Sequence, residues 1–264
     1  MPEQTVWEQF SLKSKVVLMT GASGHLGSAM ARAVAEAGAR VVVTSRDLER
    51  AQQAAAALPA VDSGPHFGVQ LDHLDENSLA TGFALAVEQA GQIDVLVNNG
   101  HEPVGAAWTS ITAEQFRRQL ENLTGYFLLS RLFRDHVVSR GTTGSLILIG
   151  SMYGQVASYP DVYEGIGPAN PVAYQALKGG VLQMTRHLAV YWAQDRIRVN
   201  SLSPGPFPGA GAATELVTRI AAKSPMQRVG RPEELKGPVV FLASDASSYM
   251  TGQNLLIDGG WTAW

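Results

Sequence analysis

The sequence predicts a single-domain, doubly wound α/β fold with a seven-stranded parallel sheet and helices on both faces. Seven short apolar runs alternate with longer alanine-rich helical patterns, which is typical of a parallel sheet buried on both sides. The composition is globular, with 45% hydrophobic and 16% charged residues. Because no internal repeat, low-complexity tract or linker is visible, residues 1–264 are expected to form one domain.

The first half of the chain alternates strands and helices regularly. Residues 15–20 (KVVLMT) form a strand-like run, and the helical pattern at 26–37 is closed by Gly38, a common residue at helix ends. Asp47 is suited to capping the N-terminus of the next helix. The elements expected after the first helix are strand 40–45, helix 48–57, strand 66–71, helix 76–90 and strand 93–98.

The second half continues the same pattern. Residues 172–184 carry a helical apolar stripe, and no proline follows Pro171 until Pro204. Pro/Gly-rich stretches at 159–171 and 204–211 follow the fifth and sixth strands and are interpreted as loops at the ligand-binding edge of the sheet. The expected elements are helix 113–139, strand 144–150, helix 174–193, strand 197–202, helix 233–243 and strand 254–257.

Charge and cysteine content exclude several classes of protein. The net charge of −3 argues against a nucleic-acid binder, which would show a basic stripe. The absence of cysteine excludes disulfides, thiol catalysis and thiolate zinc sites, and no metal site is expected. We see neither a signal peptide nor an apolar run of 18 residues, so no membrane association and a cytoplasmic location are expected.

A glycine-rich turn follows the first strand and opens a βαβ unit. Gly21, Gly24 and Gly27 have the spacing at which a backbone turns sharply and approaches a pyrophosphate at a helix N-terminus. This pattern predicts a dinucleotide-binding Rossmann fold.

Tyr174 and Lys178 lie four residues apart in the run NPVAYQALKGGVLQM. On a helix this spacing places both side chains on one face. An ammonium group beside a phenol is expected to lower its pKa from about 10, which makes an acid or base usable near neutral pH. A simple contact on a helix surface is the alternative, and the accompanying motifs favour the catalytic interpretation.

These motifs together resemble the short-chain dehydrogenase/reductase family over nearly the whole chain. TGASGHLG is similar to the family's TGxxxGxG turn, NNGH at 98–101 to its NNAG, and YQALK to its YxxxK. ENLTGYF, GSLILIGS, RVNSLSPGP, RVGRPEEL, FLASDASSYMTGQ and DGGW follow in the family's order.

The resemblance implies roles for individual residues. Tyr174 would exchange the proton of the substrate oxygen, Lys178 would lower the pKa of that phenol and bind the nicotinamide ribose, Ser151 would hold the substrate oxygen, and Asn122 would bend its helix around a relay water. The expected cofactor-binding residues are Gly21, Ser23, Gly24, His25, Leu26, Gly27, Ser45, Arg46, Asp72, His73, Asn99, Gly100, Tyr174, Lys178, Pro204 and Gly205.

Residues at the end of the second strand bear on the choice between NADP and NAD. Ser45 and Arg46 occupy the position where an acidic residue would hold the ribose hydroxyls of NAD. Arg46 is suited to clamp a 2′-phosphate, so NADP is the preferred cofactor. In the alternative, Arg46 is a solvated surface residue and NAD also binds.

The chain departs from the family pattern near the substrate. His25 replaces the middle glycine of the turn and either lies over the phosphates or points to solvent. His101 and Glu102 stand close to the expected nicotinamide, and Phe207 and Pro208 replace a threonine contact. An insertion at 152–171 is interpreted as a pocket wall or lid. The expected substrate-binding residues are His101, Tyr153, Tyr163 and Phe207, with tyrosine hydroxyls suited to a sugar-like or polyol substrate.

The resemblance thus implies an oxidoreductase that transfers hydride between NADP(H) and a small secondary alcohol or ketone. Non-redox chemistry (elimination or epimerisation) and a non-catalytic dinucleotide sensor are the alternatives. A homotetramer is expected, with a dimer next, formed through the helices at 113–139 and 174–193 and, at a second interface, Trp261 and Trp264.

Overall fold

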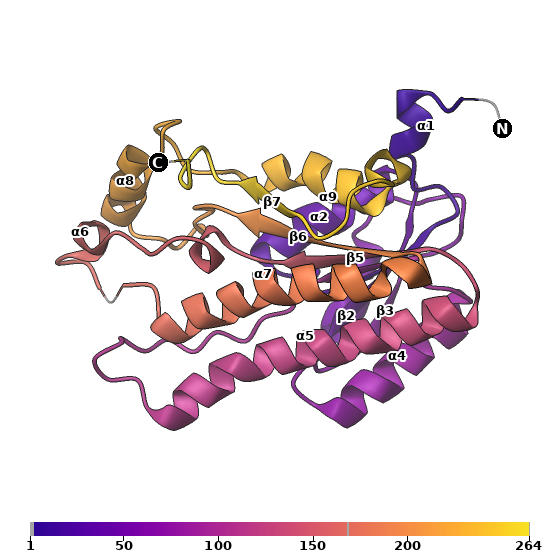
Figure 1. The fold of residues 1–264 in the computed structure, drawn as a ribbon, viewed down its shortest axis with the longest axis horizontal. Coiled ribbons are helices and arrows are strands. Elements are labelled where there is room, and N and C mark those ends of the chain that lie inside the picture. The colour runs from indigo at the N-terminus through magenta and orange to yellow at the C-terminus, as the bar shows by residue number, and fades with distance from the viewer. Residues whose placement is uncertain (1–2, 168, 264) are drawn as a thin grey trace.

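The computed structural model describes residues 3–167 and 169–263 and contains one seven-stranded parallel sheet (Figure 1). The strand order is β3-β2-β1-β4-β5-β6-β7, and every neighbouring pair is parallel. The predicted fold class is therefore confirmed. The strands are β1 (Val16–Thr20), β2 (Arg40–Ser45), β3 (Phe67–Gln70), β4 (Val95–Asn98), β5 (Gly144–Ile149), β6 (Ile197–Pro204) and β7 (Asn254–Ile257).

Helices cover both faces of this sheet. The helices are α1 (Val6–Phe10), α2 (His25–Glu36), α3 (Leu48–Ala56), α4 (Glu76–Ala90), α5 (Ala113–Ser139), α6 (Pro160–Tyr163), α7 (Val172–Trp192), α8 (Thr214–Lys223) and α9 (Lys236–Ala243). Figure 1 shows α4, α5 and α7 side by side on one face, and α2 and α9 on the other. No helix among the described residues has the length and apolarity needed to cross a membrane.

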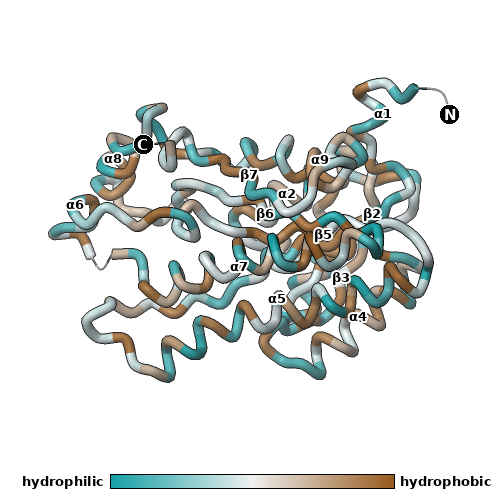
Figure 2. Tube along the Cα trace, in the orientation of Figure 1, coloured by the Kyte–Doolittle hydropathy of each residue, from teal (hydrophilic) through white to brown (hydrophobic). Residues whose placement is uncertain are grey.

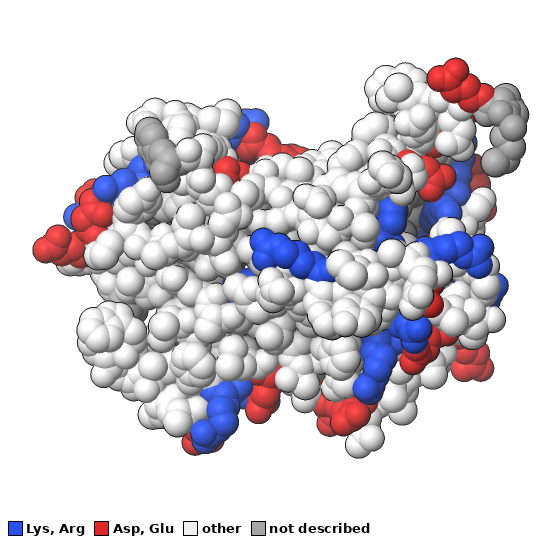
Figure 3. All heavy atoms as spheres, in the orientation of Figure 1, with Lys and Arg blue, Asp and Glu red and all other residues white. Residues whose placement is uncertain are grey.

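Alternate residues of the inner strands supply two hydrophobic cores. Val17 and Met19 pack with α2, α3 and α9, whereas Val16 and Leu18 pack with α4, α5 and α7. This alternation follows from the two-residue period of a strand, because successive side chains point to opposite faces. Apolar segments accordingly run through the strands at the centre of Figure 2, whereas charged side chains of both signs are scattered over the face shown in Figure 3.

Three features differ from the sequence-based expectations. The expected helix 233–243 begins as a separate 3₁₀ turn, Pro232–Leu235, before α9. The Pro/Gly-rich stretch 159–171, expected to be a loop, contains α6, and α8 forms after the stretch 204–211 in a segment where the sequence predicts no element. Helix α8 contacts α6 through the Lys223–Asp161 ion pair at 2.6 Å, and its Arg219 donates to the carbonyl of Glu164 directly after α6.

The C-terminal aromatic residues also differ in part from expectation. Trp261, expected at a subunit interface, is only 2% exposed within the single chain and packs edge-on against Tyr159. Its large apolar ring is buried in a third cluster beneath α6 and α8. Trp264 lies outside the described residues.

Candidate active site

A cleft of about 450 Å³ lies at the carboxyl ends of β1, β2 and β4. Strand order reverses between β1 and β4, and this switch point is where open parallel sheets bind ligands. The cleft brings together most residues that the sequence predicts for the cofactor: Gly21, Ser23, Gly24, His25, Leu26, Gly27, Ser45, Arg46, His73, Asn99 and Gly100. His101 and Glu102 also line it.

The glycine turn is built for close approach of a phosphate. A Cβ atom at Gly27 would overlap the carbonyl of Gly21, whose own φ of 64° favours glycine. Asn99 Nδ2 fixes the turn by donating to the carbonyls of Thr20 and Gly21, at 3.1 and 3.0 Å. Gly24 caps α2 without a side-chain hydrogen bond, so the first amide groups of α2 remain suited to an anion. These residues fit a dinucleotide.

Five residues of the predicted cofactor set lie outside the walls of this cleft, namely Asp72, Tyr174, Lys178, Pro204 and Gly205. Asp72 accepts a hydrogen bond from the backbone N–H of Leu74 at 3.0 Å, which caps its own loop. Pro204 ends β6, and the Gly205 N–H donates to the carbonyl of Ile257 at 2.9 Å. Their roles toward a cofactor stay predictions.

Helix α7 and strand β5 hold the predicted reacting groups. Ser151 lies two residues after β5, and its side chain is close enough to Tyr174 on α7 to influence the pKa of that phenol. Lys178 is 3% exposed, and its Nζ donates to the carbonyl of Ile149 at 2.7 Å. The same Nζ lies 5.6 Å from the centre of the Tyr174 ring. The predicted spacing therefore brings the three side chains together.

The electrostatics of this group correct one expectation. Burial raises the pKa of Tyr174, and the nearby Ser151 hydroxyl only partly opposes that rise. Burial also lowers the pKa of Lys178 to about 7. The predicted acidification of the phenol by an ammonium is thus not found in this structure, because desolvation dominates for both groups and Lys178 hydrogen bonds to a carbonyl.

His101 lies against the candidate catalytic tyrosine. Its ring packs edge-on against Tyr174, with ring centres 5.5 Å apart, and its buried Nδ1 has no hydrogen-bond partner among the described residues. Burial, followed by the nearby Lys178 and His73, lowers the pKa of His101 to about 3. A neutral imidazole with an unused nitrogen therefore faces the site, and its predicted contact with substrate stays a prediction.

Asn122 holds the loop that carries His101. Its Oδ1 accepts from the Glu102 N–H and from His73 Nε2, both at 2.8 Å. Its Nδ2 donates to the carbonyls of Glu102 and Gln119, at 3.0 and 2.9 Å. Both donors and both acceptor positions of the amide are thus occupied, and α5 is continuous through this residue. The predicted water relay at Asn122 stays a prediction.

Tyr153 and Tyr163 lie in the segment that follows Ser151, whereas Phe207 lies after β6. Tyr153 and Tyr163 hydrogen bond to each other through their hydroxyls at 2.9 Å, and burial raises the pKa of Tyr153. Phe207 packs against Gly230 and lines a separate cavity of about 160 Å³. The insertion thus forms a wall beside the site, but the two hydroxyls satisfy one another.

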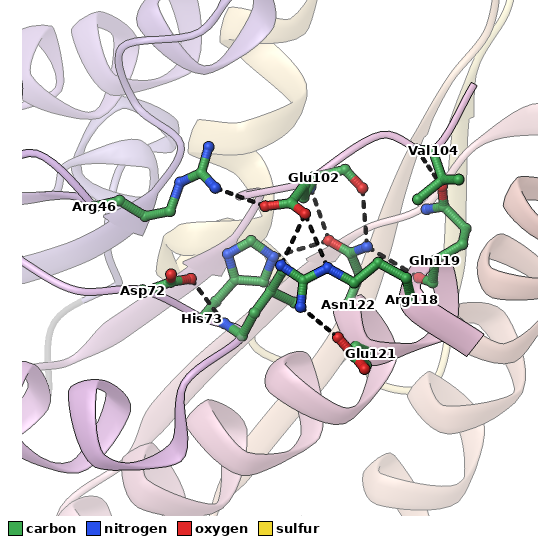
Figure 4. A network of polar contacts seen from close by, with 10 residues as sticks. Arg46, Asp72, His73, Glu102, Val104, Arg118, Gln119, Glu121 and Asn122 are labelled. Atoms are coloured by element: carbon green, nitrogen blue, oxygen red, sulfur yellow. Dashed lines mark hydrogen bonds and ion pairs between the residues drawn. The ribbon is translucent and has the colours of Figure 1, made fainter. Parts of the chain in front are cut away.

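An ion-pair network on the cleft wall was not foreseen from the sequence (Figure 4). Glu102 contacts Arg46 and Arg118, and Arg118 also contacts Glu121. Arg46 and Glu102 are 56 positions apart, so no local signal in the sequence reveals their pairing. The described residues contain no cluster of three or more His, Cys, Asp or Glu arranged to bind a metal.

Comparisons with known proteins identify the family. A family model described as enoyl-(acyl carrier protein) reductase matches residues 21–262. D-arabinitol 2-dehydrogenase [ribulose-forming] of Candida tropicalis is 34% identical, with 97% of this chain and 95% of that protein covered. Cis-4-hydroxycyclohexanecarboxylate dehydrogenase of Sinomonas cyclohexanicum is 36% identical, with 94% and 97% covered.

A solved structure shows the same likeness. Gluconate 5-dehydrogenase from Burkholderia cenocepacia, in complex with NADP and tartrate, superposes with a TM-score of 0.88. It is 27% identical in sequence, with 98% of this chain and all of that chain covered. These matches, together with the glycine cradle and the Ser151–Tyr174–Lys178 group, show that the chain belongs to the short-chain dehydrogenase/reductase family of NAD(P)-dependent oxidoreductases.

Proposed function

We propose that this oxidoreductase transfers hydride between NADP(H) and a secondary alcohol or ketone of the polyol or sugar-acid class, with Tyr174 as its general acid and base. The observation that carries this proposal is the grouping of Ser151, Tyr174 and buried Lys178 next to His101, which packs against Tyr174 and lines the cleft that fits a dinucleotide. We likewise propose that residues 1–264 act as one catalytic domain.

Each side chain has a role that its position supports. When bound, the nicotinamide cofactor supplies or accepts the hydride. The Tyr174 hydroxyl gives the proton to the substrate oxygen or takes it away, and Ser151 orients that oxygen. The Lys178 amine lies beside Tyr174, and when it is protonated its charge stabilises the phenolate that forms on Tyr174.

Two observations support the proposed substrate class: the side chain of His101 and the substrates for which related proteins are named. His101 presents a buried, neutral nitrogen that suits a hydroxyl of the substrate. Relatives named for D-arabinitol and for gluconate act on molecules with several hydroxyls. The NADP preference rests on Arg46, which lines the cleft at the end of β2.

Absorbance of the reduced cofactor tests this function directly. Purified protein is mixed with NADP or NAD and a panel that includes D-arabinitol, gluconate and cyclic hydroxy acids. We expect turnover on at least one polyhydroxylated compound, and Tyr174→Phe should reduce kcat by about 10²- to 10⁴-fold while leaving NADP binding intact. Binding of the cofactor without redox turnover across the panel would favour non-redox chemistry or a dinucleotide sensor instead.

The assembly and location are part of the proposal. The long helices α5 and α7 present Phe127, Val138, Val190 and Tyr191 to solvent, which favours their burial in a homotetramer. Light scattering coupled to size exclusion tests this, and a monomer at micromolar concentration contradicts it. The lack of cysteine supports a reducing compartment such as the cytoplasm.

A further inference from the structure

Three charged side chains form a continuous bridge along the cofactor cleft (Figure 4). Glu102 Oε2 lies 2.6 Å from Arg46 Nη1, and Glu102 Oε1 lies 2.9 Å from Arg118 Nη2. Both Arg46 and Glu102 line the cleft, so the bridge connects the end of β2 to the segment after β4 across its wall.

The backbone around Glu102 is held firmly. Asn122 accepts from the Glu102 N–H at 2.8 Å and donates to the Glu102 carbonyl at 3.0 Å. Two residues on, the Val104 N–H donates to Gln119 Oε1 at 2.8 Å. Helix α5 thus fixes the backbone of this segment at two points, and the Arg118 contact holds the Glu102 carboxylate on the side of the segment that faces Arg46.

This placement bears on how the cleft discriminates between cofactors. In the function proposed above, Arg46 accepts the 2′-phosphate of NADP. We propose that Glu102 is a specificity-determining residue that competes with this phosphate for Arg46 and so lowers the affinity for NADP relative to NAD. The inference rests on that assignment of Arg46. A dianionic phosphate reaching Arg46 displaces a carboxylate and then remains close to it, whereas NAD brings no such charge.

Arg118 limits the size of the effect. Once a phosphate takes Arg46, Glu102 keeps its contact with Arg118, so its charge is not left unpaired. The Arg46 side chain is 62% exposed and that of Glu102 is 24% exposed, so water screens their interaction. Exposed pairs of this kind are weak, and we therefore expect Glu102→Gln to tighten NADP binding by about 3- to 10-fold.

Calorimetric titration of the full chain with NADP and with NAD tests the proposal without relying on turnover. Glu102→Gln should lower the Kd for NADP. The Kd for NAD should stay within about twofold of the wild-type value. Glu121→Gln is the matched control, because it removes an equal charge that contacts Arg118 but not Arg46. Its Kd values for both cofactors should equal those of the wild type.

Two further variants keep the test decisive. Arg118→Gln leaves Glu102 with Arg46 alone and should weaken NADP binding by about twofold to threefold, opposite in sign to Glu102→Gln. In an Arg46→Gln background, Glu102→Gln should have a smaller effect on NADP binding than in the wild type, because the contested partner is gone.

The outcomes separate this inference from the function on which it rests. If Arg46→Gln weakens NADP binding selectively but Glu102→Gln leaves the ratio of NADP to NAD affinity unchanged, the competition is refuted while the role of Arg46 stands. If Glu102→Gln weakens NAD instead, Glu102 binds the ribose and the proposal is overturned. If Arg46→Gln leaves NADP binding unchanged, the assignment of Arg46 fails and the inference fails with it.

Discussion

Replacing Lys178 with methionine should stabilise the cofactor-free protein, by an amount that depends on pH. Lys178 is 3% exposed and makes one polar contact, from Nζ to the Ile149 carbonyl. Burial lowers its pKa from 10.5 to about 7, so the native state resists protonating it. Methionine has a similar length and needs no solvation, so it removes this penalty and retains most of the packing.

The size of the effect follows from the two pKa values. Between pH 7 and 10.5 the unfolded chain binds a proton at Lys178 that the folded chain gives up. Stability therefore rises with pH across this window. A pKa shift of this size means that burying Lys178 lowers the free energy of unfolding by about 4 kcal/mol at pH 7 and by about 2 kcal/mol at pH 9. Loss of the Nζ hydrogen bond offsets about 1 kcal/mol of the gain from methionine.

Urea unfolding at pH 7, 8 and 9 measures the difference, at one fixed protein concentration and without cofactor. We expect Lys178→Met to be the more stable variant at pH 7, by a margin that narrows by about 2 kcal/mol at pH 9. This window avoids Tyr174, whose raised pKa lies above 10, and His101, whose pKa is about 3. Lys13→Met, at an exposed position, controls for the loss of one charge. Parallel pH profiles for wild type and Lys178→Met would refute the reasoning.

Three other substitutions give distinct outcomes. The wild type should lose stability as the pH falls from 6.5 to 5, because the unfolded chain protonates His101 and the folded chain does not. His101→Phe should reduce that loss by about 1–2 kcal/mol, as measured by urea unfolding at both pH values. Gly27→Ala places a methyl group against the Gly21 carbonyl, so thermal unfolding should show a loss of about 1–3 kcal/mol and calorimetry a weaker NADP affinity. Tyr163→Phe leaves the buried Tyr153 hydroxyl without its partner, so urea unfolding should show a free energy of unfolding lower by about 1–3 kcal/mol. An unchanged specificity for polyols in this variant would count against a substrate role for Tyr163.

The sequence predicts well those elements whose ends carry local signals. Helix α4 begins and ends as expected, since Asp75 caps its first turn and Gly91 adopts a left-handed conformation at its end. Helix α5 also matches, and Thr112 and Gln115 form a capping box at its start. These features lie within a few residues of one another, so they are readable without knowledge of the fold.

Elements that depend on distant partners were missed. Helix α8 follows a Pro/Gly-rich stretch, and contacts with α6 help to hold it, notably between Lys223 and Asp161 and between Arg219 and Glu164. Trp261 is buried because α6 and α8 cover it, which its place near the chain end does not reveal. Glu102 was expected near the nicotinamide, yet its carboxylate reaches Arg46. Each case depends on residues far apart in the sequence.

In the candidate catalytic pair, Tyr174 and Lys178, the sequence spacing determines the positions of the side chains, whereas burial in the folded protein determines their pKa values. Spacing placed Tyr174 and Lys178 on one face of α7, and the structure has them there. Burial then raises the pKa of the phenol and lowers that of the amine, so each group favours its neutral form when the other is neutral. A phenolate would favour the charged amine in turn, and an ammonium would favour the phenolate, because opposite charges attract strongly at low dielectric. Proton loss at Tyr174 is therefore coupled to proton retention at Lys178, and the acidity that the proposed chemistry needs belongs to the pair.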